Sequence, residues 1–321
     1  MSIAAAMVLA AGRGERMRPL SDCVPKPALP LMHQPLIASA LRLAAATRTR
    51  RITVNTWHLA DLMEDALGEL ELGVEIVISR ETELMNTAGG IALARDRDLL
   101  GDDGPVLIVN GDGILNLDLS PLFQRMAVSN DLVCLALLPH LDPHRWSRVI
   151  LDHAGGVSRI KKPGSPEPGE VPLLYPGVML VAREALDDLA LTPGAIPEHL
   201  WGPALAEGRL SGVVVSGHWR EVGTPSDYLD AVLGQLNGGG AVVHPSAHID
   251  PSASIGSAFI GRGAQIEHGA VVGEAVIAEG ARVAANARVV RSVLLGPVSA
   301  CAGEIVTDEY RAAPQRQSAP R

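Results

Sequence analysis

Aromatic residues and cysteines are both scarce in this chain. Phe, Trp and Tyr make up 3% of the 321 residues, so the apolar 47% consists mainly of Ala, Val, Leu and Ile. The three cysteines, Cys23, Cys134 and Cys301, lie far apart and form no CxxC pair. This excludes a disulfide framework and a structural zinc site. Unpaired cysteines are typical of a reducing compartment, so we expect a cytoplasmic protein.

Long apolar runs and an excess of positive charge are also missing. No apolar run reaches the roughly 18 residues of a membrane span, and residues 3–11 lack the basic head of a signal peptide. The 27 Lys and Arg are outnumbered by 36 Asp and Glu, which gives a net charge of −9. Binding a nucleic-acid backbone requires a basic face. We therefore expect neither a membrane nor a nucleic acid as partner.

Strand-like and helix-like segments alternate up to about residue 236. A chain of 321 residues is long enough for two domains at about 150 residues each. Alternation of this kind predicts an α/β domain with a mostly parallel sheet, whose ligands bind beyond the carboxyl ends of the strands. The expected strands are residues 3–9, 51–55, 74–79 and 106–109, and the expected helices are residues 35–46, 59–70 and 89–97.

Beyond Gly238-Gly239-Gly240, which we expect to be a linker, the periodicity changes. Apolar residues recur at spacings of 6, 6 and 5, at Val243, Ile249, Ile255, Ile260, Ile266, Val272, Ile277, Val283, Val289 and Leu294. A helix needs a period of about 3.6 and a sandwich strand a period of about 2. Hexads in threes are instead typical of a triangular β-solenoid. We predict a β-helix over residues 241–300 and a flexible tail over residues 301–321.

The segment after the first strand is rich in glycine and arginine, and reads Leu9-Ala10-Ala11-Gly12-Arg13-Gly14-Glu15-Arg16-Met17-Arg18-Pro19-Leu20. Glycine lets backbone N–H groups approach an anion, and arginine is a bidentate donor to phosphate. Pro25-Lys26-Pro27 adds a lysine between two rigid residues. Met17 at the third glycine position excludes the dinucleotide fingerprint, and the lack of GK[ST] excludes a Walker loop. Taken alone, the glycine pair also fits an ordinary strand-to-helix turn.

Together these segments resemble the signature of nucleotide-sugar pyrophosphorylases, which join a nucleoside triphosphate to a sugar 1-phosphate. Three further segments are similar to the family's E-x-E-x-L-G-T-A-G, N-G-D and G-T-P-x-D-Y-L motifs: Glu81-Thr82-Glu83-Leu84-Met85-Asn86-Thr87-Ala88-Gly89, Asn110-Gly111-Asp112 and Gly223-Thr224-Pro225-Ser226-Asp227-Tyr228-Leu229. The repeat resembles the left-handed β-helix of many members, notably mannose-1-phosphate guanylyltransferases. The resemblance implies an α/β fold, with a Rossmann-like mixed-sheet nucleotidyltransferase domain over residues 1–236 before the β-helix.

The resemblance also implies roles for single residues. Arg16 and Lys26 match the catalytic pair that holds the triphosphate. The implied nucleotide-binding residues are Leu9, Ala10, Ala11, Gly12, Arg13, Gly14, Glu83, Thr87, Ala88 and Gly89. The implied sugar-phosphate-binding residues are Asn110, Gly111, Lys162 and Gly177.

The implied cofactor is Mg²⁺. Asp112 matches the family's metal-binding carboxylate, and Glu221 stands where a second metal-binding Asp is usual. Asp227 is the fallback for that second ligand, although we expect it in the first turn of a helix, where its charge suits the helix dipole.

Three positions depart from the family pattern. Lys161 replaces the Glu of the E-K-P motif, which helps to bind sugar hydroxyls, and Tyr175-Pro176-Gly177 replaces a common Asn-Ala-Gly. Asn86 replaces a glycine beside the nucleotide. The phosphate-binding residues of the family are therefore all present, while the residues expected around the sugar are unusual. This favours an unusual substrate such as a heptose, an N-acetylated sugar or a cyclitol phosphate.

The expected function is Mg²⁺-dependent nucleotidyl transfer from GTP to a mannose- or heptose-like 1-phosphate by a homo-oligomer. A UTP-dependent enzyme acting on an amino-sugar 1-phosphate is the first alternative. A non-catalytic regulator that binds nucleotide sugars is the second, favoured only by Glu in place of Asp at 221. The β-helix suggests a third, an acyltransferase that uses His248 or His268, although histidines at turns are usually solvated.

Overall fold

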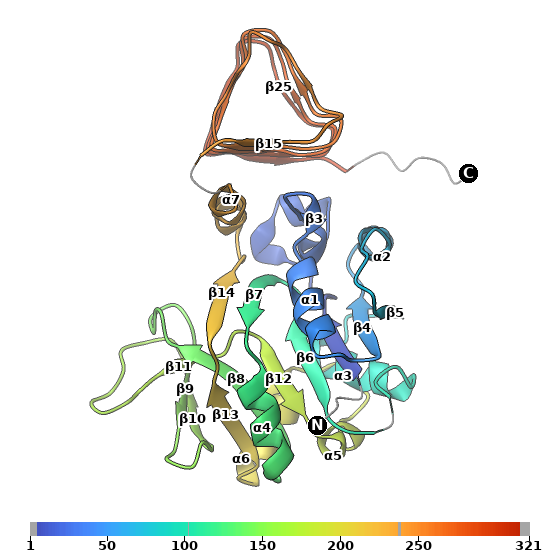
Figure 1. Ribbon diagram of the computed structural model, residues 1–321, viewed down its shortest axis with the longest axis vertical. Coiled ribbons are helices and arrows are strands. Elements are labelled where there is room, and N and C mark those ends of the chain that lie inside the picture. Colours follow the sequence, from blue (N-terminus) through green and yellow to red (C-terminus); the bar gives the residue numbers. More distant parts are fainter. Residues whose placement is uncertain (1–4, 102, 237–238, 315–321) are drawn as a thin grey trace. The chain divides into compact units, whose positions relative to one another are not determined.

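The computed structural model describes residues 5–101, 103–236 and 239–314 (Figure 1). The chain forms two compact units. Unit 1 contains the residues up to Gly12, Ile37–Ala60 and Glu69–Arg220, and unit 2 contains Arg13–Leu36, Asp61–Gly68 and the residues from Glu221 onward. The segment Arg13–Leu36 is thus grouped with the β-helix. This division differs from the domain boundaries expected at residues 236 and 241, which stay a prediction.

Unit 1 is built on a mixed sheet with the strand order β10-β9-β11-β8-β12-β6-β1-β4-β5, and β13 pairs with β8. Strands β6, β1, β4 and β5 are parallel, whereas β12 is antiparallel to both β6 and β8. The predicted α/β class is confirmed. The strands are β1 (Ala5–Leu9), β4 (Arg51–Thr56), β5 (Glu75–Arg80), β6 (Val106–Asn110), β8 (Val133–Pro139), β9 (Arg148–Leu151), β10 (Val157–Lys161), β11 (Leu173–Leu174), β12 (Val178–Val181) and β13 (Leu210–Val214).

The helices of unit 1 pack apolar side chains against this sheet. Met7, Ile91, Ile108 and Leu135 are fully buried in one cluster that joins β1, α3, β6 and β8. A separate pair of strands consists of β7 (Gly113–Leu117) and β14 (Gly217–Glu221). The helices are α1 (Ala38–Ala46), α3 (Asn86–Asp96), α4 (Ser120–Val128), α5 (Arg183–Asp187), the π-helical turn η4 (Pro197–Trp201) and α6 (Gly202–Ala206).

Unit 2 begins with short elements around the arginine-rich loop. These are η1 (Glu15–Met17), η2 (Leu20–Asp22), η3 (Lys26–Ala28), β2 (Pro30–Leu31) and β3 (Gln34–Pro35), and the unit also holds α2 (Ala60–Gly68) and α7 (Pro225–Gly234). The helix expected from residue 35 begins only at Ala38, because Pro35 pairs with Pro30 in the β2–β3 hairpin.

The rest of unit 2 is a solenoid of three parallel sheets, with the triangular cross-section seen in Figure 1. Val243 pairs with Ile260, Ile260 with Ile277, and Ile277 with Leu294, so each coil takes 17 residues. The predicted β-helix is confirmed, and the arrangement fits the left-handed form. Its strands are β15 (Ala241–Val243), β16 (His248–Ile249), β17 (Ser254–Ile255), β18 (Ala258–Ile260), β19 (Gln265–Ile266), β20 (Val271–Gly273), β21 (Ala275–Ile277), β22 (Arg282–Val283), β23 (Arg288–Val290), β24 (Val293–Leu295), β25 (Ser299–Ala300), β26 (Ile305–Thr307) and β27 (Tyr310–Ala312).

The β-helix runs further than we expected. The expectation of a flexible tail from residue 301 is wrong over residues 301–314, because β26 and β27 continue the sheets and Val306 is fully buried. The polar residues that suggested a tail are paired, since Arg311 contacts Glu304 at 2.7 Å and Glu309 at 2.8 Å. The rest of that expected tail, residues 315–321, lies outside the described residues.

Within the part of the chain that the structure describes, no helix has both the length and the apolar character that crossing a bilayer requires. The cytoplasmic location stays a prediction.

Candidate functional site

The carboxyl ends of three neighbouring strands in unit 1 lie side by side. Leu9 at the end of β1 is in register with Asn55 on β4 and with Asn110 on β6. The backbone N–H of Asn110 donates to the carbonyl of Gly177 at 2.8 Å, and that of Gly111 donates to the carbonyl of Leu9 at 2.9 Å. The structure thus brings together the end of the first strand and three of the expected sugar-phosphate-binding residues.

Two glycines allow this close approach. A Cβ atom on Gly111 would lie 2.9 Å from the carbonyl oxygen of Leu9. Gly177 has a φ of +88°, and a Cβ there would lie 2.6 Å from Nδ2 of Asn110. Side chains at either position would push the turn off the strand. This turn carries the half-buried Asp112, which lies two residues after the end of β6.

A buried carboxylate supports the end of β1, and the sequence analysis gave it no role. Glu81 is 5% exposed, and its Oε1 accepts from Nδ2 of Asn55 at 2.8 Å while its Oε2 accepts from the backbone N–H of Met85 at 3.0 Å. Oδ1 of Asn55 in turn accepts from the N–H of Ala10 at 2.8 Å. Burial raises the pKa of Glu81, although these hydrogen bonds oppose the shift. The signal in the sequence was an Asn and a Glu directly at strand ends.

The expected nucleotide-binding residues at the start of α3 contact another part of unit 1. The N–H groups of Ala88 and Gly89 both donate to the carbonyl of Gly194, and Oγ1 of Thr87 accepts from the N–H of Ile196 at 2.9 Å. These donors and this acceptor therefore hold the loop before η4. Glu83 is exposed and lies in the loop before the helix.

Asn86 also has a conformational explanation. Its φ is +57°, a left-handed conformation that glycine adopts freely and that asparagine tolerates better than most residues. With Asn86 in place of the family's glycine, the turn can therefore keep the same backbone conformation.

In unit 2 the arginine-rich loop folds back onto Lys26. Gly14 has a φ of +62°, and a Cβ there would lie 3.2 Å from the Cβ atoms of both Lys26 and Ser21. Its carbonyl accepts from the N–H of Met17 and from Oγ of Ser21, both at 2.8 Å. Lys26 is consequently 6% exposed, whereas Arg16 is exposed. Unit 2 therefore contains both members of the expected catalytic pair.

Gly12 differs from Gly14, because a Cβ atom on Gly12 would meet nothing within 4 Å. Packing in the described chain therefore does not require glycine at residue 12. Close approach of a ligand to the backbone would require it.

The expected second metal ligand lies against the expected catalytic arginine. Nη2 of Arg16 donates to Oε1 of Glu221 at 3.1 Å, and the two side chains are 69% and 18% exposed. Asp227 has a different role, because it forms a capping box with Thr224 at the start of α7. The expectation that Asp227 sits in the first turn of a helix is confirmed.

The remaining expected site residue, Lys162, directly follows β10 and is exposed. Its neighbour Lys161 donates to Oε1 of Glu167 at 2.6 Å and to Oε1 of Glu170 at 2.5 Å. Lys161 is therefore engaged by two carboxylates of the same unit.

A family model described as "Nucleotidyl transferase" matches residues 5–237. The chain belongs to the nucleotidyl transferase family. The chain is therefore an enzyme of that family.

Two relatives illustrate the range of this family. The chain is 26% identical over 271 residues to a probable mannose-1-phosphate guanylyltransferase of Oryza sativa, covering 78% of this chain and 74% of that protein. It is 36% identical over 226 residues to the N-acetylmuramate alpha-1-phosphate uridylyltransferase of Neisseria meningitidis, covering 68% of this chain and 93% of that one. The crystal structure of HddC from Yersinia pseudotuberculosis shares the fold, with a TM-score of 0.59 and 20% identity over 72% of this chain and 98% of that chain.

Nucleotidyl transferases of this family generally use a divalent metal ion. Among the residues that the structure describes, no three His, Cys, Asp or Glu side chains are grouped to hold one. Mg²⁺ needs fewer protein ligands than that, since one or two carboxylates with substrate phosphates and waters complete its octahedron. The carboxylate of Asp112, at the end of β6, fits such a hard cation. Asp112 belongs to unit 1 and Glu221 to unit 2.

Replacing Asn55 with alanine tests the support under the loop that follows β1, where we expect the nucleotide. The change leaves the N–H of Ala10 and Oε1 of Glu81 without their buried partner, while Oε2 of Glu81 keeps the N–H of Met85. Such a loss costs about 1–3 kcal/mol of unfolding free energy. We expect a lower melting temperature and a KM for the nucleoside triphosphate raised about tenfold, equivalent to about 1.4 kcal/mol. Thr53→Ala is the matched control, because Thr53 is also buried on β4 and donates to the carbonyl of Leu99. Equal KM values in both variants would show that Asn55 only stabilises the fold.

The β-helix supports the Lys26 segment, so its removal should affect catalysis. The ring of His33 lies 5.6 Å from that of Phe259 and 5.9 Å from that of His244. Strands β18 and β21 lie against α7, whose buried Tyr228 donates from Oη to the carbonyl of Pro30 at 2.6 Å, and β27 lies against η2. A chain ending at Leu236 should melt at a lower temperature and show kcat reduced about tenfold or more, because small shifts of a positioned group are costly.

His33→Ala in the full chain is the companion variant, since it removes only the ring contacts. Light scattering on the shortened protein shows in addition whether the β-helix is needed for assembly. Unchanged kcat and melting temperature in the shortened chain would contradict the supporting role.

Proposed function

We propose that this enzyme transfers a nucleotidyl group from a nucleoside triphosphate to a sugar 1-phosphate and releases pyrophosphate. The observation that carries the proposal is the register of Leu9, Asn55 and Asn110 at one sheet edge. From there the chain continues directly from Gly12 into the arginine-rich loop. Backbone for a nucleotide and fixed cations for a triphosphate thus follow one another closely in the sequence, and the carboxylate for a metal, Asp112, stands two residues after Asn110.

The roles that we propose for the residues are those that the family resemblance implies. The backbone from Leu9 to Gly12 binds base and ribose, with Arg13 and Gly14 beside the phosphates and Glu83 and Thr87–Gly89 completing the nucleotide side. Asn110, Gly111, Gly177 and Lys162 bind the sugar phosphate. Arg16 and Lys26 hold the triphosphate.

The reaction needs no covalent intermediate on the protein. A phosphate oxygen of the sugar 1-phosphate forms a bond to the α-phosphorus, and the bond from that phosphorus to the pyrophosphate oxygen breaks, with its electron pair leaving on pyrophosphate. Two polyanions must meet, so catalysis consists mainly of positioning and charge stabilisation. The positive charges of Arg16 and Lys26 stabilise the charge that develops on the α-phosphate and the leaving group.

Asp112 would hold the divalent cation, for which we propose Mg²⁺, with Glu221 as a second carboxylate. When bound, this cation supplies positive charge to the phosphates that react. The ion pair between Glu221 and Arg16 keeps the arginine close to that carboxylate.

For the substrates we propose GTP with a mannose- or heptose-like 1-phosphate. The guanylyltransferase relative supports this pair, because its match extends over 78% of the chain. UTP with an N-acetylated amino-sugar 1-phosphate is the second candidate, favoured by the higher identity of 36% to the uridylyltransferase relative. We also propose a homo-oligomer, which light scattering tests.

A pyrophosphate-release screen separates these candidates. Each common nucleoside triphosphate is combined with a panel of sugar 1-phosphates, with and without Mg²⁺. Release that requires both substrates and the metal supports the proposal, and the best pair identifies base and sugar. Binding of nucleotide sugars with no release would favour a regulator, and acyl transfer from a CoA thioester would favour the acyltransferase alternative.

A further inference from the structure

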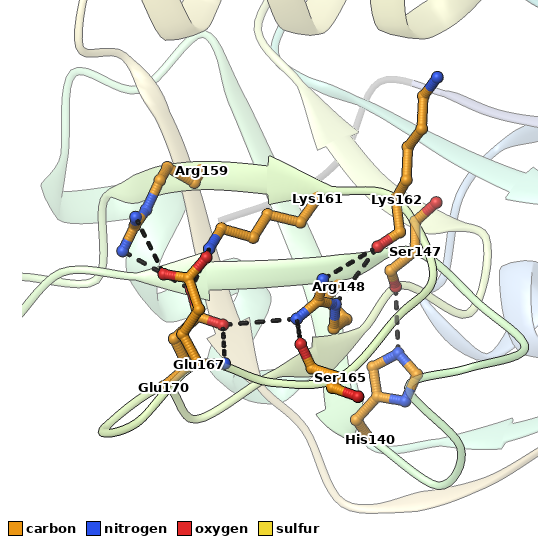
Figure 2. Close-up of polar contacts among 9 residues, drawn as sticks. All are labelled: His140, Ser147, Arg148, Arg159, Lys161, Lys162, Ser165, Glu167 and Glu170. Atoms are coloured by element: carbon orange, nitrogen blue, oxygen red, sulfur yellow. Dashed lines mark hydrogen bonds and ion pairs between the residues drawn. The ribbon is translucent and has the colours of Figure 1, made fainter.

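One buried guanidinium holds the segment that carries Lys162. The side chain of Arg148, at the start of β9, is 9% exposed. Its Nε and Nη2 both donate to the carbonyl of Lys162, at 3.3 and 3.2 Å, and its Nη1 donates to the carbonyl of Ser165 at 2.7 Å (Figure 2). Arg148, the first residue of β9, thereby fixes the backbone just after the end of β10.

Glu170 supplies the negative charge that a buried arginine needs. Its side chain is 5% exposed, and its Oε2 accepts from Nη1 of Arg148 at 3.4 Å and from the N–H of Glu167 at 2.8 Å. Its Oε1 accepts from Nζ of Lys161 and lies 3.7 Å from Nη2 of Arg159. The hydrogen bond from Lys161 lowers the pKa of Glu170, so the carboxylate stays ionised at neutral pH.

Neighbouring lysines at the end of β10 have opposite orientations. Successive side chains of a strand point to opposite faces. Lys161 turns towards Glu167 and Glu170, whereas Lys162 extends away from this cluster (Figure 2). Lys162 is exposed, and its ammonium has no ion-pair or hydrogen-bond partner among the described residues. Lys161 is therefore part of the support, and a glutamate in its place would face the carboxylate of Glu170.

We propose that Arg148 is a positioning residue for Lys162, and that Glu170 holds Arg148 in place. The proposal rests on the proposed function, in which Lys162 binds the phosphate of the sugar 1-phosphate. Arg148 touches no substrate in this account, because its donors are engaged by Lys162, Ser165 and Glu170 and its side chain is buried. Lysine is a compact charge on a flexible stem, so its reach depends on a fixed backbone.

Arg148→Lys is the first test, because it keeps the charge beside Glu170 and loses the planar fork. We expect KM for the sugar 1-phosphate to rise at least about tenfold and KM for the nucleoside triphosphate to stay within about twofold, since misplacing a positioned group by about 1 Å costs up to about 100-fold. Glu170→Gln, which keeps the side-chain shape, should show a smaller change of the same kind. It serves as the second variant if Arg148→Lys does not fold.

The double variant Arg148→Lys/Lys162→Ala gives the decisive comparison. If Arg148 acts through Lys162, the double variant should bind the sugar 1-phosphate no more weakly than Lys162→Ala alone, because the two effects are coupled. Arg125→Lys is the matched control, since Arg125 also joins a carboxylate, that of Asp131, to a loop carbonyl, that of Ala154. It should change the melting temperature without changing KM for the sugar 1-phosphate.

Four outcomes would overturn the inference. Additive effects in the double variant, or equal rises in both KM values for Arg148→Lys, would make Arg148 a purely structural residue. A raised KM for the sugar 1-phosphate in Lys162→Ala with an unchanged one in Arg148→Lys would overturn the positioning role while leaving the proposed function intact. If pyrophosphate release by the wild-type enzyme does not depend on a sugar 1-phosphate, the proposed function is overturned, and this inference with it.

Discussion

Replacing Lys26 with alanine should lower kcat by at least about 100-fold. In the proposed mechanism this lysine places a fixed positive charge where negative charge develops, and loss of one such donor typically costs about 3–4 kcal/mol. Lys26 is 6% exposed, so its removal also leaves space beneath Gly14. Lys26→Met keeps most of the packing and removes only the charge. Pyrophosphate-release kinetics together with thermal melts separate the two effects, and near-normal kcat in a folded Lys26→Met protein would remove Lys26 from the triphosphate site.

Arg16→Ala should have an effect of similar size with less change in stability, because its side chain is 69% exposed. Arg18 offers a matched control in the same loop. It is 62% exposed and pairs with Asp22 at 3.1 Å, and the proposed function gives it no role. Arg18→Ala should leave kcat within about twofold, since exposed ion pairs contribute about 0–1 kcal/mol. Equal losses in both variants would indicate general electrostatic attraction of the substrate instead of a specific contact.

Replacing Asp112 with asparagine should abolish metal-dependent activity. A bound cation contributes several kcal/mol of charge stabilisation, so its loss should lower kcat by more than about 100-fold. Asn keeps the size of the side chain and cannot supply the charge. The measurement is kcat as a function of Mg²⁺ concentration, with Mg²⁺ affinity followed by calorimetry in the presence of the triphosphate. Full activity in Asp112→Asn would remove it as the metal ligand.

The same Mg²⁺ titration shows whether Glu221 or Asp227 is the second metal ligand. Glu221→Gln should weaken Mg²⁺ affinity, whereas Asp227→Asn should cost only about 1 kcal/mol of stability through the capping box. If Glu221→Gln keeps full activity and Mg²⁺ affinity while Asp227→Asn loses both, the second ligand has been assigned to the wrong residue.

The β-helix was predictable because its periodicity is local and repeated. Every coil takes 17 residues, and the paired residues are the apolar ones that the spacing picks out. The end of the solenoid was missed because Ala300 takes the place of a large apolar residue and the chain becomes polar from Thr307 onward. Charged residues of this segment are paired in the folded chain, as Arg311 with Glu309 shows, which the sequence does not reveal.

Residues of the candidate site were predictable only where they belong to a motif of the family. Gly14, Gly111 and Gly177 each have a close approach or a positive φ in the structure that explains the glycine. The buried polar residues Asn55, Glu81 and Arg148 were missed. Their partners lie on other strands or loops, and hydrogen bonds between such segments leave no periodicity in the sequence.

The most direct test of the proposed function is product analysis of the wild-type reaction by ³¹P NMR. The enzyme is mixed with Mg²⁺, GTP and mannose 1-phosphate, and with the other pairs of the screen. We expect one pair to yield nucleotide sugar and pyrophosphate in equal amounts, and added pyrophosphate to reverse the reaction. Triphosphate cleaved without a sugar-linked product, or no turnover with any pair, would contradict it.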